Sequence, residues 1–145
     1  MGCDIHVHVE VKIKGKWLHY GVYFVERNYL LFAILAGVRN YDKVLPFVEP
    51  RGIPKDVSDL TLFDWERSET DWHTPSYIND REVEALNARL LAAKAIKHPD
   101  TISDCLKGFY LFGNNMDSYI QYPEDGKRLF GMGYEASRIV FWFDN

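Results

Sequence analysis

The chain has 145 residues, 47% of them apolar and 15% aromatic, and this length predicts a single domain over residues 1–145 with a sizeable core. Its longest apolar stretch, residues 30–38, is about half of the roughly 20 residues that a bilayer span requires, and the N-terminus lacks a signal-peptide apolar region. We therefore expect a soluble, cytoplasmic protein without a membrane partner. The net charge of −4 and the scattered Lys and Arg residues argue against duplex nucleic acid as a partner, because non-specific duplex binding requires clustered cations.

Residues 3–14 alternate strictly between apolar and polar side chains, which predicts a strand with one buried face. Gly15, followed by residues 17–24, predicts a hairpin into a second strand. The expected buried face carries Cys3, Ile5, Val7, Val9, Val11 and Ile13, and the opposite face carries Asp4, His6, His8, Glu10, Lys12 and Lys14.

Two helices are predicted. Residues 29–36 are apolar nearly all round, with Asn28 as the cap and Gly37 as the stop, which indicates a short buried helix. The second helix follows a capping box formed by Asn79 and Glu82 and runs to about Lys97. Its expected apolar stripe consists of Val83, Leu86, Leu90 and Leu91.

Between these helices lies an irregular stretch, residues 40–79. Loops of this length in compact domains are usually functional or disordered, and disordered segments rarely carry so many aromatic residues. We therefore expect an ordered excursion that faces a ligand. Its aromatic residues include Phe47, Phe63, Trp65 and Trp72.

The C-terminal residues 137–144 alternate again and predict a strand. Ile139, Phe141 and Phe143 share one face, opposite Arg138, Val140, Trp142 and Asp144. Strands at both ends that enclose helices indicate an α+β fold. We expect a mostly antiparallel sheet that includes the N-terminal and C-terminal strands and packs against two or three helices.

The polar face of the first strand is the first candidate site. Residues two apart on a strand share a face at about 6.5 to 7 Å between Cα atoms, so His6 and His8 can converge on one metal ion or one phosphate. Zinc also requires a third and usually a fourth ligand, and Asp4 is a candidate. The alternative is a solvated strand face that carries two histidines, since antiparallel sheets commonly expose one face.

A second cluster spans residues 71–76, where His73 could complete the histidine site as a third ligand or act as a general acid. The alternative assigns Asp71 and Ser76 to turns and caps and leaves His73 exposed. His19 and His98 are expected to be peripheral.

Four arginines form a third set, because Arg binds carboxylate or phosphate in a bidentate manner. They are Arg27, Arg39, Arg51 and Arg138. The alternative is that each is a surface residue or an ion-pair partner, and for Arg138 the expected partner is Asp144 on the same strand face.

Several separated blocks resemble a family of small uncharacterised phage and prophage proteins. The blocks are Met1-Gly-Cys-Asp-Ile-His-Val-His-Val-Glu10, Arg27-Asn-Tyr-x-Leu-Phe-Ala-x-Leu-Ala-Gly-Val-Arg-Asn40, Arg51-Gly-Ile-Pro-x-Asp-Val-Ser58, the loop of residues 71–76, and Arg138-Ile-Val-Phe-Trp-Phe-Asp-Asn145. The resemblance implies an accessory phage protein in the bacterial cytosol. Such proteins often counter host defence, and some bind or destroy the nucleotide signals that defence systems use. The resemblance brings no established activity or catalytic residue with it.

The leading hypothesis is therefore a protein that binds a phosphate-bearing nucleotide or similar small anion and sequesters a host defence signal. The expected ligand-binding residues are Asp4, His6, His8, Arg39, Arg51, His73, Ser76 and Arg138. One alternative is a phosphoesterase that uses a divalent ion (zinc, manganese or magnesium) held by His6, His8, His73 and Asp4. Another is a module that inhibits a host enzyme by direct contact. The sequence leaves the ligand's identity and homo-oligomer formation open.

Overall fold

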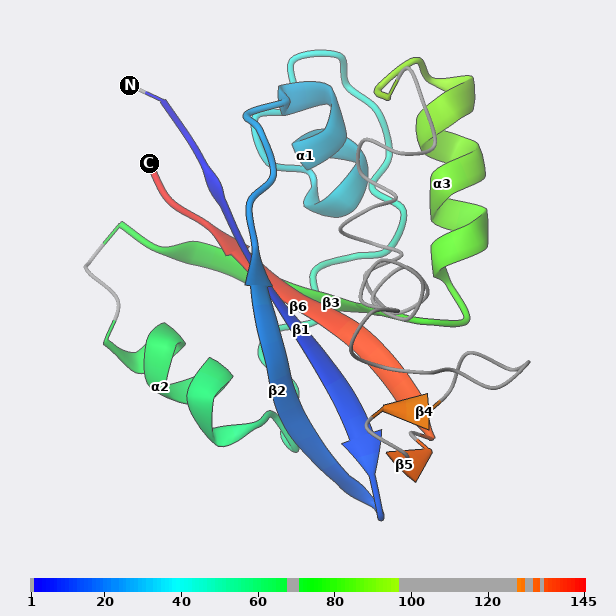
Figure 1. The fold of residues 1–145 in the computed structure, drawn as a ribbon. Helices are drawn as coiled ribbons and strands as arrows, with labels where there is room; N and C mark the ends of the chain where they lie inside the picture. The colour runs from blue at the N-terminus through cyan, green and yellow to red at the C-terminus, as the bar shows by residue number, and fades with distance from the viewer. Residues whose placement is uncertain (1, 68–70, 97–127, 130–131, 134) are drawn as a thin grey trace.

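A central antiparallel sheet of four strands organises the computed structural model, which describes residues 2–67, 71–96, 128–129, 132–133 and 135–145. Figure 1 shows α1 and α3 on one side of this sheet and α2 on the other. The strand order is β2-β1-β6-β3, and β4 and β5 form a separate ladder. This architecture confirms the predicted α+β fold. The elements are β1 (Ile5–Ile13), β2 (Lys16–Tyr23), α1 (Tyr29–Ala36), α2 (Asp59–Glu66), β3 (His73–Asn79), α3 (Val83–Ala92), β4 (Arg128–Leu129), β5 (Met132–Gly133) and β6 (Ala136–Phe143).

The predicted hairpin connects β1 to β2 through a tight turn. Ile13 pairs with Lys16, so the turn consists of Lys14 and Gly15, which both have positive φ angles, 51° and 76°. Left-handed angles at both central residues give the turn a twist that matches the twist of the strands. The register continues to Glu10 opposite His19, and a bulge follows. This register places His19 beside the polar face of β1.

The apolar face of β1 and β6 packs against α1 and α3, as predicted. The Asn28 side chain accepts a hydrogen bond from the Leu31 N–H, and Gly37 ends α1 in the left-handed conformation with φ 73°. All of α1 from Leu31 to Ala36 is buried. The shared core joins the sheet residues Val7, Val9, Ile139, Phe141 and Phe143 to Leu31, Phe32, Ile34 and Leu35 of α1 and to Val83, Leu86 and Leu90 of α3.

The predicted second helix is shorter than expected. Its capping box is present, since the Asn79 side chain accepts from the Glu82 N–H and the Glu82 side chain accepts from the Asn79 N–H, both at 3.1 Å. However, α3 ends at Ala92, and Lys94 has a positive φ of 58° that no helix continues through. Leu91, predicted for the apolar stripe, is 38% exposed. Lys97 and His98 lie outside the described residues.

The excursion of residues 40–79 is ordered but not structureless, because it contains α2 and β3. Neither element carries a strong sequence signal. Only Thr61 of α2 is buried, so the helix lacks an apolar stripe. Pro75 lies within β3, and proline in a strand is tolerated mainly at a sheet edge, which is where β3 lies.

Both faces of β6 are buried, and the second face is the one that carries polar residues on β1. His8 is 3% exposed and Glu10 is fully buried. The alternative of a solvated strand face is therefore wrong for His8 and Glu10, because α2 and the segment before it cover this part of the face (Figure 1). Asp4 and Lys14 are exposed and His6 is partly exposed. Among the described residues, no helix is long and apolar enough to cross a membrane.

Candidate functional site

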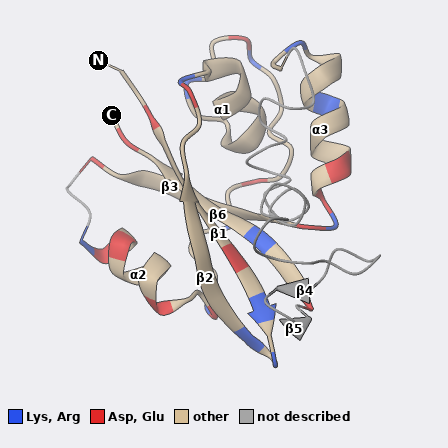
Figure 2. Cartoon of the chain, viewed as in Figure 1, with Lys and Arg blue, Asp and Glu red and all other residues tan. Residues whose placement is uncertain are grey.

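The covered polar face of β1 lies beside β6, with His6 opposite Trp142, His8 opposite Val140 and Glu10 opposite Arg138. The N-terminal and C-terminal strands, which were expected in one sheet, are thus direct neighbours. Figure 2 shows the acidic position on β1 and the basic position on β6 within the sheet. Successive polar residues of β1 nevertheless bind different partners, so the predicted site divides into three groups along the strand.

The first group lies at the two chain ends. His6 Nε2 is 2.8 Å from Asp144 Oδ2, and the Asp4 N–H donates to Asp144 Oδ1 at 3.0 Å. The Arg27 guanidinium donates to both carboxylate oxygens of Asp4, and this contact lowers the pKa of Asp4. The predicted pairing of Arg138 with Asp144 is wrong, because His6 occupies that carboxylate.

His73 belongs to the same end of the sheet, since it pairs with Phe143 in the β3–β6 ladder. Its ring nitrogens contact Thr74 Oγ1 at 2.8 Å and Asn145 Oδ1 at 3.2 Å. His73 therefore lies near the His6 end of β1, without a contact to His6 or His8 among the described residues.

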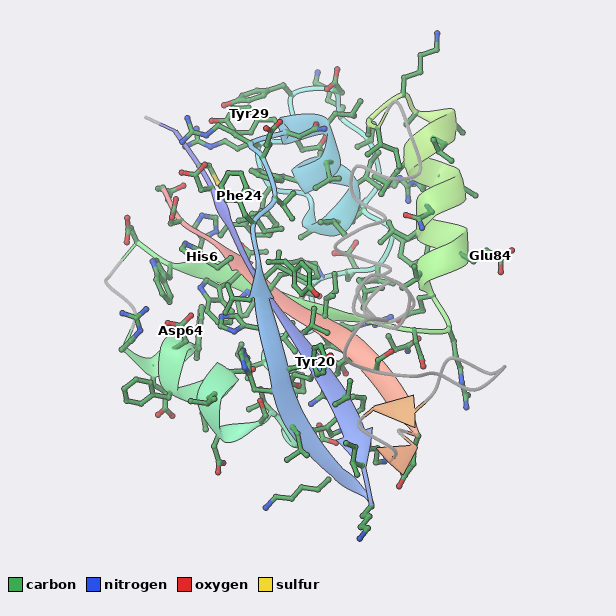
Figure 3. All side chains as sticks on the ribbon, in the orientation of Figure 1. His6, Tyr20, Phe24, Tyr29, Asp64 and Glu84 are labelled. Atoms are coloured by element: carbon green, nitrogen blue, oxygen red, sulfur yellow. The ribbon has the colours of Figure 1, made fainter. Side chains whose placement is uncertain are left out.

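The second group is a chain of three side chains, Asp64, His8 and His19. Asp64 Oδ2 lies 2.8 Å from His8 Nε2, and His8 Nδ1 lies 2.9 Å from His19 Nε2. Figure 3 shows Asp64 on α2 on the side of the sheet that also carries His6. Arg67 donates to the other oxygen of Asp64 at 2.6 Å. The three residues come from α2, β1 and β2.

These contacts determine the tautomer of both histidines when the imidazoles are neutral. The Asp64 carboxylate accepts the Nε2 proton of His8, so His8 Nδ1 is an acceptor for the Nε2 proton of His19. His19 Nδ1 then carries a lone pair. Burial lowers the pKa of His8 and of His19, which favours the neutral forms.

Aromatic rings pack against the central residue of this chain, His8. The His8 ring is stacked on fully buried Trp142 at 4.9 Å between centroids. Trp65 and Trp72 approach Trp142 at 5.3 and 5.5 Å, and Trp72 also lies 4.6 Å from His6. Trp65 and Trp72 of the excursion thus lie over the polar face, whereas Phe47 packs against the core and Phe63 is exposed.

The third group is built on Glu10 and Arg138. Arg138 Nε donates to Glu10 Oε1 at 2.8 Å, and its Nη1 donates to Asp56 Oδ1 at 2.9 Å. The other oxygen of Glu10 accepts from the backbone N–H and hydroxyl of Ser58. The Arg138 guanidinium also lies 3.8 Å from the centroid of the Trp17 ring. Two carboxylates therefore neutralise Arg138, which leaves it poorly suited to bind a further anion.

A pocket of about 510 Å³ lies between β2 and the segment that leads into α2. Its lining joins residues 15–19 to residues 56–60, and it includes Lys16, Trp17, His19, Asp56, Ser58 and Asp59. None of the predicted ligand-binding residues lines this pocket. His8 and Arg138 lie behind its lining instead, since His8 contacts His19 and Arg138 contacts Asp56.

The remaining predicted residues are placed elsewhere. Arg51 forms a bidentate pair with Glu82, at 2.7 and 2.5 Å, and its backbone N–H donates to Ser76 Oγ. Arg39 donates to the Tyr41 hydroxyl at 3.3 Å. Neither arginine lines the pocket. Arg51 instead ties the excursion to the start of α3.

The predicted metal ligands are engaged separately. Asp4 contacts Arg27, His6 contacts Asp144, and His8 contacts Asp64 and His19. Within the part of the chain that the structure describes, no three His, Cys, Asp or Glu side chains form a group that could hold a metal ion. The metal-dependent alternative therefore gains no third ligand from these residues.

Two central residues of the candidate site were missed. His19 was interpreted as peripheral, although a regular hairpin register from Ile13 and Lys16 places it opposite Glu10. The hairpin spacing could therefore have predicted that His19 lies beside Glu10. No comparable signal pointed to Asp64, because it contacts His8 across 56 residues of sequence.

Comparisons with known proteins give this site no precedent: no family model, no curated protein and no solved structure matches the chain. The resemblance to phage proteins stays a prediction.

Proposed function

We propose that the chain binds a small phosphate-bearing nucleotide in the pocket between β2 and α2. The pocket itself carries this proposal, since its volume of about 510 Å³ falls within the range of roughly 300–1,000 Å³ that is usual for small-ligand sites. The proposed site differs from the predicted one, because Arg138 and the other predicted ligand-binding residues do not line this pocket.

Three features of the lining suit a nucleotide. Trp17 offers an aromatic surface, which favours a base. Lys16 offers an ammonium group at the start of β2, and the start of α2 offers backbone N–H groups that no helical carbonyl accepts. Asp56 and Asp59 oppose an anion, but Arg138 already offsets the charge of Asp56.

The biological role that we propose is sequestration of a nucleotide signal of bacterial defence. This part rests on the resemblance to small phage proteins. A protein that only binds must hold its ligand without consuming it, so bound nucleotide should be recovered intact after the protein is denatured.

The test is a thermal-shift and calorimetric screen with AMP, ADP-ribose and cyclic dinucleotides. A ligand at about 100 times its dissociation constant should stabilise the folded protein by about 2.7 kcal/mol. Lys16→Glu should weaken binding and Asp59→Asn should strengthen it. Lys14→Glu is the matched control, because it makes the same charge change two residues away, on the hairpin turn and outside the pocket lining. If none of these nucleotides raises the melting temperature at millimolar concentration, the proposal fails.

A second candidate function, inhibition of a host enzyme by contact, is favoured by exposed apolar side chains on the excursion. Leu60 is 62% exposed and Phe63 66%, one turn apart on α2, and exposed apolar side chains grouped on a surface can mark interaction sites. Phe63→Ser should abolish stoichiometric capture of one bacterial protein and leave nucleotide binding unchanged. Equal capture of the bacterial protein by the wild type and by Phe63→Ser would contradict this candidate function.

A further inference from the structure

We propose that His19 is a general base, held in position by His8 and Asp64, that activates water against an ester bound in the pocket. The proposal rests on the proposed function in one respect, namely that the pocket accepts a small ligand. It goes further because the same pocket would hydrolyse a small ester, a ligand distinct from the nucleotide that the proposed function holds intact.

The direction of the hydrogen bonds along Asp64, His8 and His19 determines which nitrogen of His19 can accept a proton. The acceptor at the start of the chain is a carboxylate, so both protons in the chain point toward Asp64. The last nitrogen, His19 Nδ1, is consequently left as a proton acceptor. Among the described residues nothing donates to this nitrogen, and His19 is one of the residues that line the pocket.

His8 and Asp64, which orient His19, are themselves held in fixed positions. His8 is 3% exposed and stacked on Trp142, and Asp64 is held by Arg67 as well as by His8. A base that is oriented by a second side chain, itself oriented by a carboxylate, is the arrangement that activates nucleophiles in several unrelated enzymes. His8 and Asp64 would be positioning residues, whereas His19 would meet the attacking water.

The proposed step balances without a further reagent. The water oxygen forms a bond to the carbonyl carbon or phosphorus of the ester, and one water proton passes to His19 Nδ1. The ester oxygen leaves with its bonding electrons and takes that proton, which yields an acid and an alcohol. Carboxylic and phosphoric esters share this chemistry, so the test includes one of each.

The charged and titratable groups around His19 determine how its basicity responds to substitution. Glu10 and Asp64 raise its pKa, whereas burial lowers the pKa further than they raise it. His8 faces it from β1, and Lys16, Asp56 and Asp59 share its pocket. Removal of the Asp64 charge should therefore lower the pKa of the His8–His19 pair.

The experiment measures hydrolysis of p-nitrophenyl acetate and of bis(p-nitrophenyl) phosphate by the full chain between pH 5 and 9. General-base catalysis is worth about 10²- to 10⁴-fold, so His19→Gln should reduce the rate on at least one ester by tenfold or more. Asp64→Asn should reduce the rate on that ester and shift the acidic limb of its pH profile to lower pH. The matched control is Val22→Gln, which places the same amide on the same face of β2 outside the pocket lining and should leave the rate unchanged.

Circular dichroism and melting curves establish that each variant is folded. If a variant is not folded, nitrogen-15 NMR of the wild-type protein near neutral pH takes the place of its assay. The spectrum is expected to show His19 Nδ1 without a proton. Equal rates for His19→Gln and the wild type on both esters, or a proton on His19 Nδ1 at neutral pH, would overturn the proposal. Failure of nucleotide binding alone would instead overturn the proposed function, because the ester assay does not use a nucleotide.

Discussion

Glu10 and Arg138 face each other on adjacent strands, β1 and β6, and are joined by a hydrogen bond of 2.8 Å in the interior of the protein. Glu10 is fully buried and Arg138 is 5% exposed. A shift of one of these strands by one residue would turn its member of the pair to the apolar face and leave the other charge without its partner. The pair therefore specifies the pairing of the two terminal strands as well as the position of Ser58 ahead of α2.

Removal of one partner of this pair should be strongly destabilising. Glu10→Ala or Arg138→Ala should each lower the free energy of unfolding by about 3–5 kcal/mol, because the other charge remains buried without its partner. The double substitution Glu10→Leu with Arg138→Met should recover much of this loss. Urea denaturation measures the effect. The exposed Arg27–Asp4 pair is the control, and a loss as large for Arg27→Ala would contradict the role of burial.

The two histidines of β1 should differ sharply. His8→Ala removes the side chain that binds both Asp64 Oδ2 and His19 Nε2 and leaves a space beside Trp142, so it should cost about 2–4 kcal/mol. His6→Ala removes a side chain that is 32% exposed and should cost less than about 1 kcal/mol. Chemical denaturation of both variants checks this difference. Equal effects would mean that α2 does not cover His8 in solution.

Stability should fall as the pH is lowered from 7 to 5. The folded state lowers the pKa of His8 and of His19, so between the ordinary histidine value of about 6.5 and the lower folded values the unfolded chain binds more protons. Protonation then favours unfolding. The free energy of unfolding of His19→Gln should decline less steeply over this range. Carboxyl groups with a lowered pKa, Asp4, Asp56 and Glu82, lose their contribution only at more acidic pH. If the free energy of unfolding had the same pH dependence in the wild type and in His19→Gln, the prediction would be contradicted.

Gly37→Ala tests the stop of α1. Gly37 has φ 73°, and an added Cβ would meet no atom within 4 Å, so the cost is one of backbone conformation alone. That cost is about 1–2 kcal/mol for an L-residue in the left-handed region. Gly37→Asn should cost less, since Asn tolerates this region better. Thermal denaturation of both variants gives the comparison, and a melting temperature for Gly37→Ala equal to that of the wild type would exclude the conformational cost.

Much of the fold was readable from local patterns. The hairpin, the caps of α1, the Asn79–Glu82 capping box and the two terminal strands each depend on residues close in sequence. Their register also follows locally, because a tight turn at Lys14 and Gly15 leaves one way to pair β1 with β2. The sequence did not reveal α2 and β3, because α2 lacks an apolar stripe and β3 contains Pro75.

The sequence by itself determined which side chains share a face of each strand, since alternation follows from the two-residue period of an extended backbone. It placed His6, His8 and Glu10 together and opposite the apolar residues. Only the tertiary structure decided what covers that face and how its residues pair. Ser58 meets Glu10 across 48 residues and Asp64 meets His8 across 56, and contacts so distant arise from the packing of whole elements and not from any local pattern. The pairing of Asp64, His8 and His19 depends on that packing, and the neutral, oriented imidazole of His19 is its consequence.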